Sequence, residues 1–284
     1  MRALIFSLIG ISFFMTPVSY AQKNMSSCDL GHTALQEGDT ESAISFLEIC
    51  LDTEDLESNV EAVIHSTLGA AYIFEDRFPE ALNALNMAFA IAETQHAEIS
   101  NPVIWRNRGI ARAQTGRPEG ALEDLMTAIS IDPNDVLSHL NLGAIYQELD
   151  RPADVVVAFD RVVRLEPEWV GGWLNRSGAL LDMGLTEAAV DDARRAVELD
   201  PTNGSSLNML CWTLIKDGRA STALPLCEQA VAAEPEIGAI VHSHASALEA
   251  VGRNEEARAL FARAHDLSPD DPEISADFER THSP

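Results

Sequence analysis

Five prolines recur at intervals of 34 residues along the chain. They are Pro133, Pro167, Pro201, Pro235 and Pro269. Each closes a short segment of similar character, such as "IDP", "LEP" or "LSP". A period of this length is typical of arrays in which one small structural unit is repeated and stacked. The spacing therefore defines a repeat frame in which each proline occupies position 32.

This frame divides most of the chain into seven repeats, the first three being separated by insertions at 58–61 and 96–101. The repeats are 24–57, 62–95, 102–135, 136–169, 170–203, 204–237 and 238–271. Columns that did not define the frame also agree with it. Position 20 is alanine in six of the seven repeats, position 15 is always glycine or aspartate, and position 8 is always small. The array is therefore a property of the whole sequence.

Each repeat is predicted to fold into two antiparallel helices. Apolar residues have helical spacing over positions 1–14 and 18–31. Glycine or aspartate at position 15 can adopt the left-handed conformation that ends the first helix, and proline at position 32 cannot continue the second. Asn101 and Pro102 suit the cap and first turn of the third repeat. Because one hairpin cannot bury its apolar face alone, the hairpins are expected to stack.

The pattern resembles the tetratricopeptide repeat family over residues 24–271. The residues that carry the resemblance are Trp105 and Trp173 at position 4, Leu68-Gly69 and Leu142-Gly143 at positions 7–8, and Tyr72 and Tyr146 at position 11. Repeats five to seven depart from it at position 8, where they lack glycine. The resemblance implies an all-α fold, a right-handed α-solenoid of stacked antiparallel helix hairpins whose first helices line a concave groove.

The tail 272–284 is predicted to contain a short capping helix at 273–280. Ile274 and Phe278 are expected to pack on the last repeat. Asp277 and Glu279 are expected to face water.

The four cysteines fall into two pairs within single repeats. Cys28 and Cys50 occupy positions 5 and 27 of the first repeat, and Cys211 and Cys227 occupy positions 8 and 24 of the sixth. Both pairs of positions sum to 32, which places the partners at equal height across an antiparallel hairpin. We therefore predict disulfides Cys28–Cys50 and Cys211–Cys227. The alternatives are four small buried thiols, or a lipid attached to Cys28.

The first residues have the pattern of a secretory signal peptide. A basic Arg2 precedes an apolar run over residues 3–15, and small residues at Ser19 and Ala21 suit cleavage before Gln22. The run is short for a membrane span, so a retained anchor is the less favoured alternative. Residues 1–21 are therefore predicted to be removed, leaving a soluble exported chain, periplasmic or secreted, in which disulfides can form.

Composition and motifs argue against several classes of function. The chain has 45 acidic against 19 basic residues, a formal charge of −26, which repels nucleic acid and anionic lipid. It contains no glycine-rich phosphate loop, no Cys-x-x-Cys pair and no His-Glu-x-x-His motif. His242 and His244, two apart on a helix, point in different directions and make a poor metal pair. We expect no catalytic residues, no metal and no cofactor.

Adjacent acidic residues on the second helices of two repeats have two interpretations. These residues are Glu123, Asp124, Asp191 and Asp192, at positions 22–23. Paired carboxylates can act in acid–base catalysis, but on the outer helix a solvated face is the favoured interpretation.

The concave positions supply the candidate binding residues. The resemblance places positions 2, 5, 6, 9, 12 and 13 on or near the groove, where four acidic and two basic residues leave it near neutral. The candidates are Asn107, Asn141 and Asn175 at position 6, with Arg106, Trp212 and Phe74. Asparagine can bond both backbone groups of an extended peptide, and the aromatic residues can act as apolar anchors. Alternatively, the asparagines and aromatic residues have packing roles.

The sequence therefore predicts an exported, non-enzymatic scaffold or adaptor that binds a partner protein or extended peptide in its groove. Two alternatives stay open. One is a periplasmic holdase for unfolded exported chains, which would bind many unrelated apolar peptides. The other is a non-catalytic subunit of an envelope enzyme complex.

Overall fold

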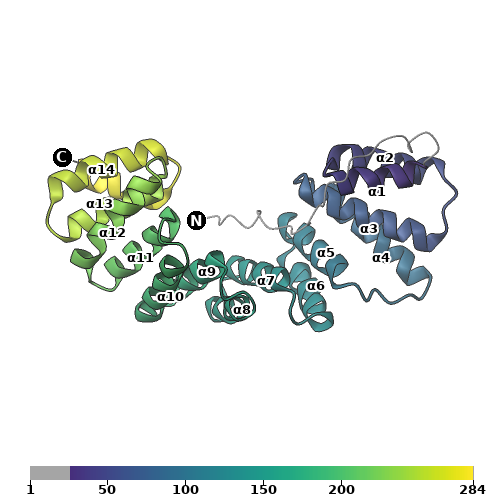
Figure 1. Ribbon diagram of the computed structural model, residues 1–284, viewed down its shortest axis with the longest axis horizontal. Helices are drawn as coiled ribbons and strands as arrows, with labels where there is room; N and C mark the ends of the chain where they lie inside the picture. The colour runs from purple at the N-terminus through teal and green to yellow at the C-terminus, as the bar shows by residue number, and fades with distance from the viewer. Residues whose placement is uncertain (1–25, 284) are drawn as a thin grey trace. The chain divides into compact units, whose positions relative to one another are not determined.

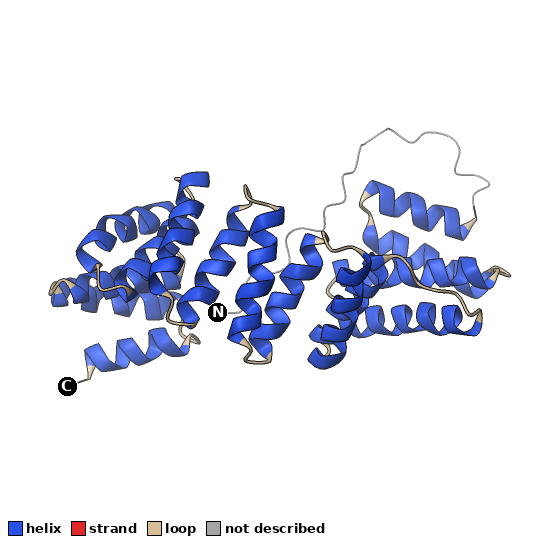
Figure 2. Cartoon of the chain, turned by 90° about the horizontal axis from the view of Figure 1, so that it is seen from below, coloured by secondary structure: helices blue, strands red, loops and turns tan. Residues whose placement is uncertain are grey.

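The computed structural model describes residues 26–283. Within these residues the secondary structure is helical throughout and includes no strand (Figure 2). This confirms the predicted all-α solenoid of helix hairpins. The predicted signal peptide, residues 1–21, lies outside the described residues. None of the described helices is both long enough and apolar enough to cross a membrane.

The chain divides into two compact units, one ending at Leu149 and the other beginning at Asp150. The first contains α1 (Ser27–Glu37), α2 (Thr40–Thr53), α3 (Ser58–Phe74), α4 (Phe78–Thr94), α5 (Pro102–Gln114), α6 (Pro118–Ile131) and α7 (Val136–Glu148) (Figure 1). The second contains α8 (Pro152–Leu165), α9 (Val170–Asp182), α10 (Thr186–Leu199), α11 (Gly204–Lys216), α12 (Ala220–Ala233), α13 (Gly238–Ala250), α14 (Asn254–Leu267) and α15 (Pro272–His282). Within each unit, successive hairpins pack side by side.

The helix ends lie where the repeat frame predicts them. Position 15 has positive φ in all seven repeats, at Gly38, Asp76, Gly116, Asp150, Gly184, Gly218 and Gly252. From the third repeat onward, the second helix of each repeat ends two residues before its proline. The side chain of Asn101 accepts a hydrogen bond from the Val103 amide at 3.0 Å and caps α5. The local turn chemistry and the overall period therefore specify the same helices.

Close approach of the two helices explains the small residues at position 8. A Cβ added at Gly31 would lie 2.5 Å from Leu47 Cγ, and one at Gly69 would lie 2.4 Å from Leu85 Cγ. Both leucines are fully buried and occupy position 24. Positions 8 and 24 thus face each other across the hairpin, as their sum of 32 predicts.

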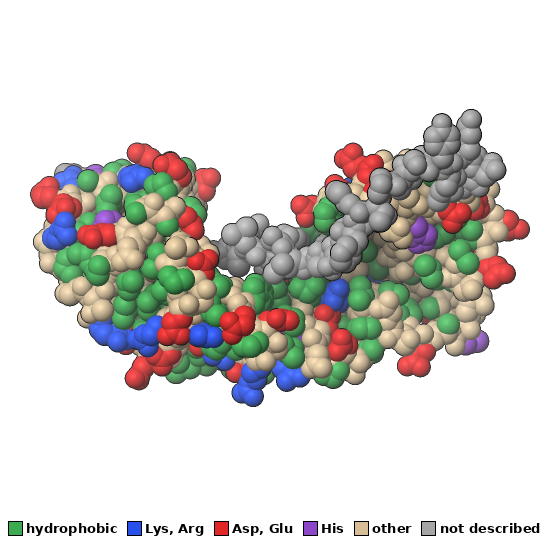
Figure 3. Space-filling view, viewed as in Figure 1, with side chains coloured by type: hydrophobic (Ala, Val, Ile, Leu, Met, Phe, Trp, Pro, Cys, Tyr) green, Lys and Arg blue, Asp and Glu red, His purple; other side chains and the backbone are tan. Residues whose placement is uncertain are grey.

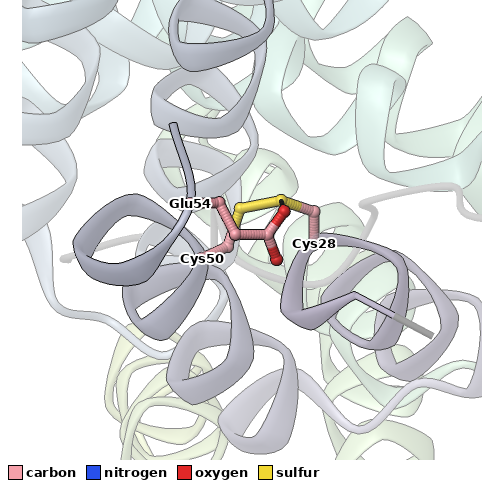
Figure 4. Close-up of side chains that lie close together, drawn as sticks. All are labelled: Cys28, Cys50 and Glu54. Carbon is pink, nitrogen blue, oxygen red and sulfur yellow. Dashed lines mark hydrogen bonds between the residues drawn. A yellow bond between two sulfur atoms is a disulfide. The ribbon is translucent and has the colours of Figure 1, made fainter. Parts of the chain in front are cut away.

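Both predicted cysteine pairs lie at disulfide distance. The sulfur atoms are bonded, and the Cα atoms are 5.1 Å apart for Cys28–Cys50 and 5.3 Å apart for Cys211–Cys227. The first pair joins α1 to α2 (Figure 4). None of the four cysteines is free.

The interpretation of the adjacent acidic residues as a solvated face is wrong for two of the four. Asp124 is 1% exposed and Asp192 is 5% exposed, whereas Glu123 and Asp191 are exposed. Asp124 accepts hydrogen bonds from Arg108 Nε at 2.9 Å and from Nη2 at 2.6 Å. The reason is geometric, because position 23 of the second helix faces position 7 of the first.

The fifth repeat contains the same arrangement. Arg176 at position 7 donates from Nε and Nη2 to the two carboxylate oxygens of Asp192, at 2.7 Å and 2.8 Å. Its Nη1 also donates to Asp160 at 2.8 Å. Hydrogen bonding to Asp192 raises the pKa of Arg176 above its already high ordinary value. Both arginine–aspartate pairs therefore hold the two helices of one hairpin together.

Helix α15 spans Pro272–His282, where a helix over 273–280 was expected, and one of its residues has other contacts than expected. Ile274 is 2% exposed and packs with Val241 and Ala264 of the last hairpin. The Phe278 ring stacks on His265 at 4.5 Å between centroids. Asp277 does not simply face water, because its Oδ2 lies 2.9 Å from Nε2 of His242.

The environment of Asp277 explains its protonation state. Burial alone would raise the pKa of this carboxyl, but hydrogen bonds from His242 and Arg280 outweigh burial, and the pKa lies below its ordinary value. Arg280 also forms two bonds to Glu249, at 2.7 Å and 2.8 Å. Polar contacts thus supplement the apolar packing of Ile274 and hold α15 against the last hairpin.

Candidate binding groove of the first unit

A cavity of about 530 Å³ opens on the first unit among α1, α3, α5 and α7, the first helices of four successive repeats. It is lined by Leu35, Gln36, Gly38, Thr40, Thr67, Ala70, Ala71, Ile73, Phe74, Val103, Arg106, Asn107, Ile110 and Leu137. All of these except Gly38, Thr40 and Ala71 occupy the positions that the family resemblance assigns to the groove. We call this cavity the first-unit groove.

The lining is mostly apolar because helical spacing directs one stripe from each helix into it. On α3 the stripe contains Thr67, Ala70 and Phe74, and on α5 it contains Val103 and Ile110. Phe74 is 55% exposed and Val103 is 39% exposed, although both are large apolar residues. Exposed apolar side chains that gather in a concavity are typical of a binding surface.

Three of the six candidate binding residues line this groove. They are Phe74, Arg106 and Asn107. Arg106 Nη1 lies 2.7 Å and 2.8 Å from the two carboxylate oxygens of Asp135, just before α7. This pair is largely buried, so the positive charge of Arg106 is neutralised within the chain. The groove therefore offers hydrogen-bond donors without a free cation.

The other two asparagines lie elsewhere. Asn141 on α7 does not line the cavity, and its Nδ2 donates to the Leu137 carbonyl at 2.7 Å. One donor of this amide therefore serves its own helix, as the packing interpretation allows. Asn175 is half-buried on α9 and belongs to the second unit.

Trp212 also lies in the second unit, where it contacts its neighbours. Lys216 Nζ lies 4.0 Å from the centroid of the indole ring, and the His242 ring of α13 lies 5.9 Å away. Trp212 is half-buried. These contacts match the packing alternative at least in part, because the ring bridges two adjacent first helices.

Sequence reasoning missed the apolar residues that contribute most of the groove. Leu35, Val103, Ile110 and Leu137 lie at positions 12, 2, 9 and 2 of their repeats. The position rule that selected the polar candidates would have found these residues as well. It does not indicate that the groove opens into a cavity at this part of the array, which depends on how α1, α3, α5 and α7 pack.

One cluster of possible metal ligands occurs among the described residues, at Cys28, Cys50 and Glu54 (Figure 4). Glu54 Oε2 lies 3.3 Å from Cys28 Sγ, and Oε1 accepts the Ser27 amide at 3.0 Å. The two sulfurs are bonded to each other. Glu54 thus acts as a cap for the first turn of α1, and the sulfurs are not thiolate ligands in this state.

Acidic residues far outnumber basic residues in the first unit. Residues 26–149 include 21 acidic side chains, five arginines and no lysine. On the face shown in Figure 3, acidic side chains are scattered over this unit and basic ones are few. The groove therefore lies in a region of negative potential.

Comparison with known proteins places the repeats in one family. The model described as "TPR repeat" matches residues 109–150, and the model described as "Tetratricopeptide repeat" matches residues 172–279. The first range covers the end of the first unit, and the second covers most of the second unit.

Curated relatives match over part of the array. The chain is 28% identical over 99 residues to a STIP1 homolog of Dictyostelium discoideum, covering 35% of this chain and 18% of that protein. It is 27% identical over 137 residues to protein FlbA of Caulobacter vibrioides, covering 48% of this chain and 22% of that protein. It is 27% identical over 96 residues to an Hsp70-Hsp90 organizing protein of Triticum aestivum, covering 34% and 16% respectively. The matches thus span about a fifth of the length of these relatives.

Solved structures resemble nearly the whole chain in fold. A tetratricopeptide repeat protein from Parabacteroides merdae superposes with a TM-score of 0.67 at 16% identity, covering 90% of this chain and 97% of that one. The C-terminal part of a TPR repeat-containing protein from Cytophaga hutchinsonii gives 0.66 at 11% identity, covering 87% and 97%. At these identities the likeness concerns the fold alone.

Proposed function

Because the chain belongs to the tetratricopeptide repeat family, we propose that it is an exported, non-enzymatic scaffold that binds a partner protein or extended peptide in its concave groove. The observation that supports this most directly is the apolar first-unit groove, into which Phe74 projects with 55% of its surface exposed. The relative named as an Hsp70-Hsp90 organizing protein also engages other proteins, according to its name. The two cysteine pairs at disulfide distance support an oxidising, exported environment.

Within this proposal, Phe74 is the apolar anchor and Asn107 bonds the backbone of the bound segment. Asn141 in the first unit and Asn175 in the second repeat the same amide at 34-residue spacing and are further candidate contacts. Arg106, held by Asp135, adds donors, and Trp212 is a further apolar contact in the second unit. The apolar lining also favours a second candidate, a holdase, which would bind unrelated apolar peptides equally well.

Replacing Phe74 with alanine tests the groove. The partner is first captured from native envelope extract with the purified protein, identified, and then prepared separately for binding isotherms. Loss of a central aromatic anchor is expected to cost about 2 kcal/mol, or roughly thirty-fold in affinity. Met126→Ala is the matched control, because Met126 on α6 is 54% exposed and lies outside the groove. Equal affinity of both variants and the parent would contradict binding in this groove.

The asparagine row is tested separately. Replacing Asn107, Asn141 and Asn175 together with alanine should leave the fold intact and weaken partner binding, each lost hydrogen bond being worth about 0.5–1.5 kcal/mol. Asn86→Ala on the exposed face of α4 is the control. Single variants then assign the loss, and Asn107 is expected to contribute most because it lines the groove. If the triple variant melts at a lower temperature and binds normally, the asparagines have a packing role.

A further inference from the structure

Three carboxylates without an ion-pair partner among the described residues are sequence neighbours of residues that line the first-unit groove. Glu37 and Asp39 alternate along the chain with the lining residues Gln36, Gly38 and Thr40, at the turn between α1 and α2. Glu75 directly follows Phe74, at the turn between α3 and α4. Glu37 and Asp39 are exposed and Glu75 is half-buried. We call these three residues the acidic mouth.

Within the acidic mouth, Asp39 accepts a hydrogen bond at the start of α2. The Ser42 backbone amide donates to Asp39 Oδ1 at 3.1 Å. Hydrogen bonding with Ser42 holds the pKa of Asp39 below its usual value. Among the described residues, no arginine, lysine or histidine lies within ion-pair distance of these three carboxylates, the nearby Arg77 being paired with Glu80 at 3.0 Å.

The arginine that lines the groove and two others on α5 are already paired with carboxylates of the chain. Arg106 is bound by Asp135, and Arg108 and Arg112 share Asp124 at 2.6 Å and 2.9 Å. Residues 26–149 have a formal charge of −16. An anionic segment entering the groove would therefore be repelled, and would find Arg106 occupied.

We propose that the partner of this groove is a peptide segment with apolar side chains on one face and lysine or arginine at the end that reaches the acidic mouth. This rests on the proposed function and specifies its ligand. The apolar stripes of α3 and α5 bind the apolar face. Glu37, Asp39 and Glu75 attract the cationic end, which determines the direction in which the segment lies.

Three labelled peptides of equal length test the proposal by fluorescence anisotropy with the purified protein. The first alternates leucine with lysine, the second alternates leucine with glutamate, and the third alternates serine with lysine. The leucine–lysine peptide is expected to bind at least about tenfold more tightly than either of the others, because only it satisfies both the groove and the mouth. Equal or tighter binding of the leucine–glutamate peptide overturns the proposal.

A charge-matched pair of variants separates the mouth from the general acidity of the protein. Glu37→Gln with Glu75→Gln should weaken binding of the leucine–lysine peptide about 2- to 30-fold, the range expected for two solvent-accessible ion pairs. The control is Glu119→Gln with Glu123→Gln, two exposed residues of α6, which changes the net charge equally. If both double variants lose the same affinity for the leucine–lysine peptide, the attraction is a long-range effect of net charge, and the proposed role of the acidic mouth is wrong.

The Phe74→Ala variant separates failure of this inference from failure of the proposed function. If it weakens binding of every leucine peptide while the mouth variants have no effect, the groove binds peptide and only the charge preference is wrong. If Phe74→Ala changes the affinity of none of the peptides, groove binding itself is wrong, and the inference that rests on it fails as well.

Discussion

At the scale of single residues, the buried pair Arg108–Asp124 fills a place that other repeats fill with apolar side chains. Positions 7 and 23 hold Leu68 and Ala84 in the second repeat. In the third repeat, Asp124 is bonded by Arg108 and by Arg112 Nη1 at 2.9 Å, and the Arg108 guanidinium lies 3.3 Å from the Phe89 ring centroid. The hairpin thus tolerates either an ionic or an apolar contact at this point, and removal of one partner leaves a charge buried.

Replacing Asp124 with alanine should therefore destabilise the protein by about 3–5 kcal/mol, because the Arg108 guanidinium loses its buried counter-charge. The double variant Arg108→Leu with Asp124→Ala reproduces the pair found in the second repeat and should recover most of that loss. Denaturant unfolding of parent, single and double variants measures the effect. A double variant no more stable than Asp124→Ala would show that the ionic contact is itself needed.

His244 occupies position 7 of the seventh repeat, where it has no such partner. Both ring nitrogens are buried and neither has a hydrogen-bond partner among the described residues. Burial lowers the pKa of this imidazole, and Glu228, Arg253 and Glu256 are the charged groups around it. The folded protein therefore holds His244 neutral at a pH where the unfolded chain is already protonated.

It follows that His244 should make stability depend on pH in a defined direction. Below the unfolded pKa of about 6.5 the unfolded state binds more protons at this residue, so the free energy of unfolding falls as the pH falls. His244→Leu removes this contribution while restoring the leucine found at position 7 of other repeats. The free energies of unfolding at neutral and at mildly acidic pH should therefore differ less in His244→Leu than in the parent. An identical pH dependence would contradict the prediction.

At the scale of helices and hairpins, much of the structure could be predicted because local chemistry and period agree. Proline at position 32 and a left-handed residue at position 15 bound the helices, and the sum rule placed Cys211 opposite Cys227. The prediction was wrong where it depended on how a helix is rotated about its axis. Asp124 and Asp277 are charged residues, and only the neighbouring Arg108 and His242 reveal that they turn inward.

The disulfides give the hairpins of the first and sixth repeats a covalent cross-link. Cys211 and Cys227 are 16 residues apart, and Cys28 and Cys50 are 22 apart. Closing loops of this size in the unfolded chain should contribute about 3 kcal/mol per bridge. The variant Cys211→Ala with Cys227→Ala should lose this amount under oxidising conditions.

The control for the Cys211→Ala, Cys227→Ala variant is the parent protein under reducing conditions. Alanine is a suitable replacement at position 8, because the seventh repeat already has Ala245 there. Reduction also opens the Cys28–Cys50 bridge, so the matching variant replaces Cys28 and Cys50 with alanine as well. The reduced parent and this variant under oxidising conditions should have similar free energies of unfolding. Four titratable thiols in the denatured, unreduced parent would contradict both bridges.

At the scale of the whole molecule, the two compact units contribute differently to the proposed binding. The first unit includes the apolar groove and its acidic mouth, whereas in the second unit Trp212 and His242 are packed against neighbours and α15 covers the last hairpin. Of the three asparagines predicted from the repeat frame, Asn107 and Asn141 belong to the first unit and Asn175 to the second. The repeat frame gives the spacing of the asparagines along the sequence but not their contacts. Asn107 lines the groove, whereas Asn141 donates to the Leu137 carbonyl.

The predicted export of the protein can be tested on the whole molecule, together with the two disulfides. Chain recovered from the native compartment is expected to begin at Gln22, since Ser19 and Ala21 provide the small residues that a signal peptidase requires. The same material should contain no free thiol, because export is what allows both bridges to form. Mass spectrometry of the intact protein, with and without alkylation, measures both. A mass that retains Met1 would indicate a membrane-anchored or unexported chain, and a lipid mass on Cys28 would exclude its bridge to Cys50.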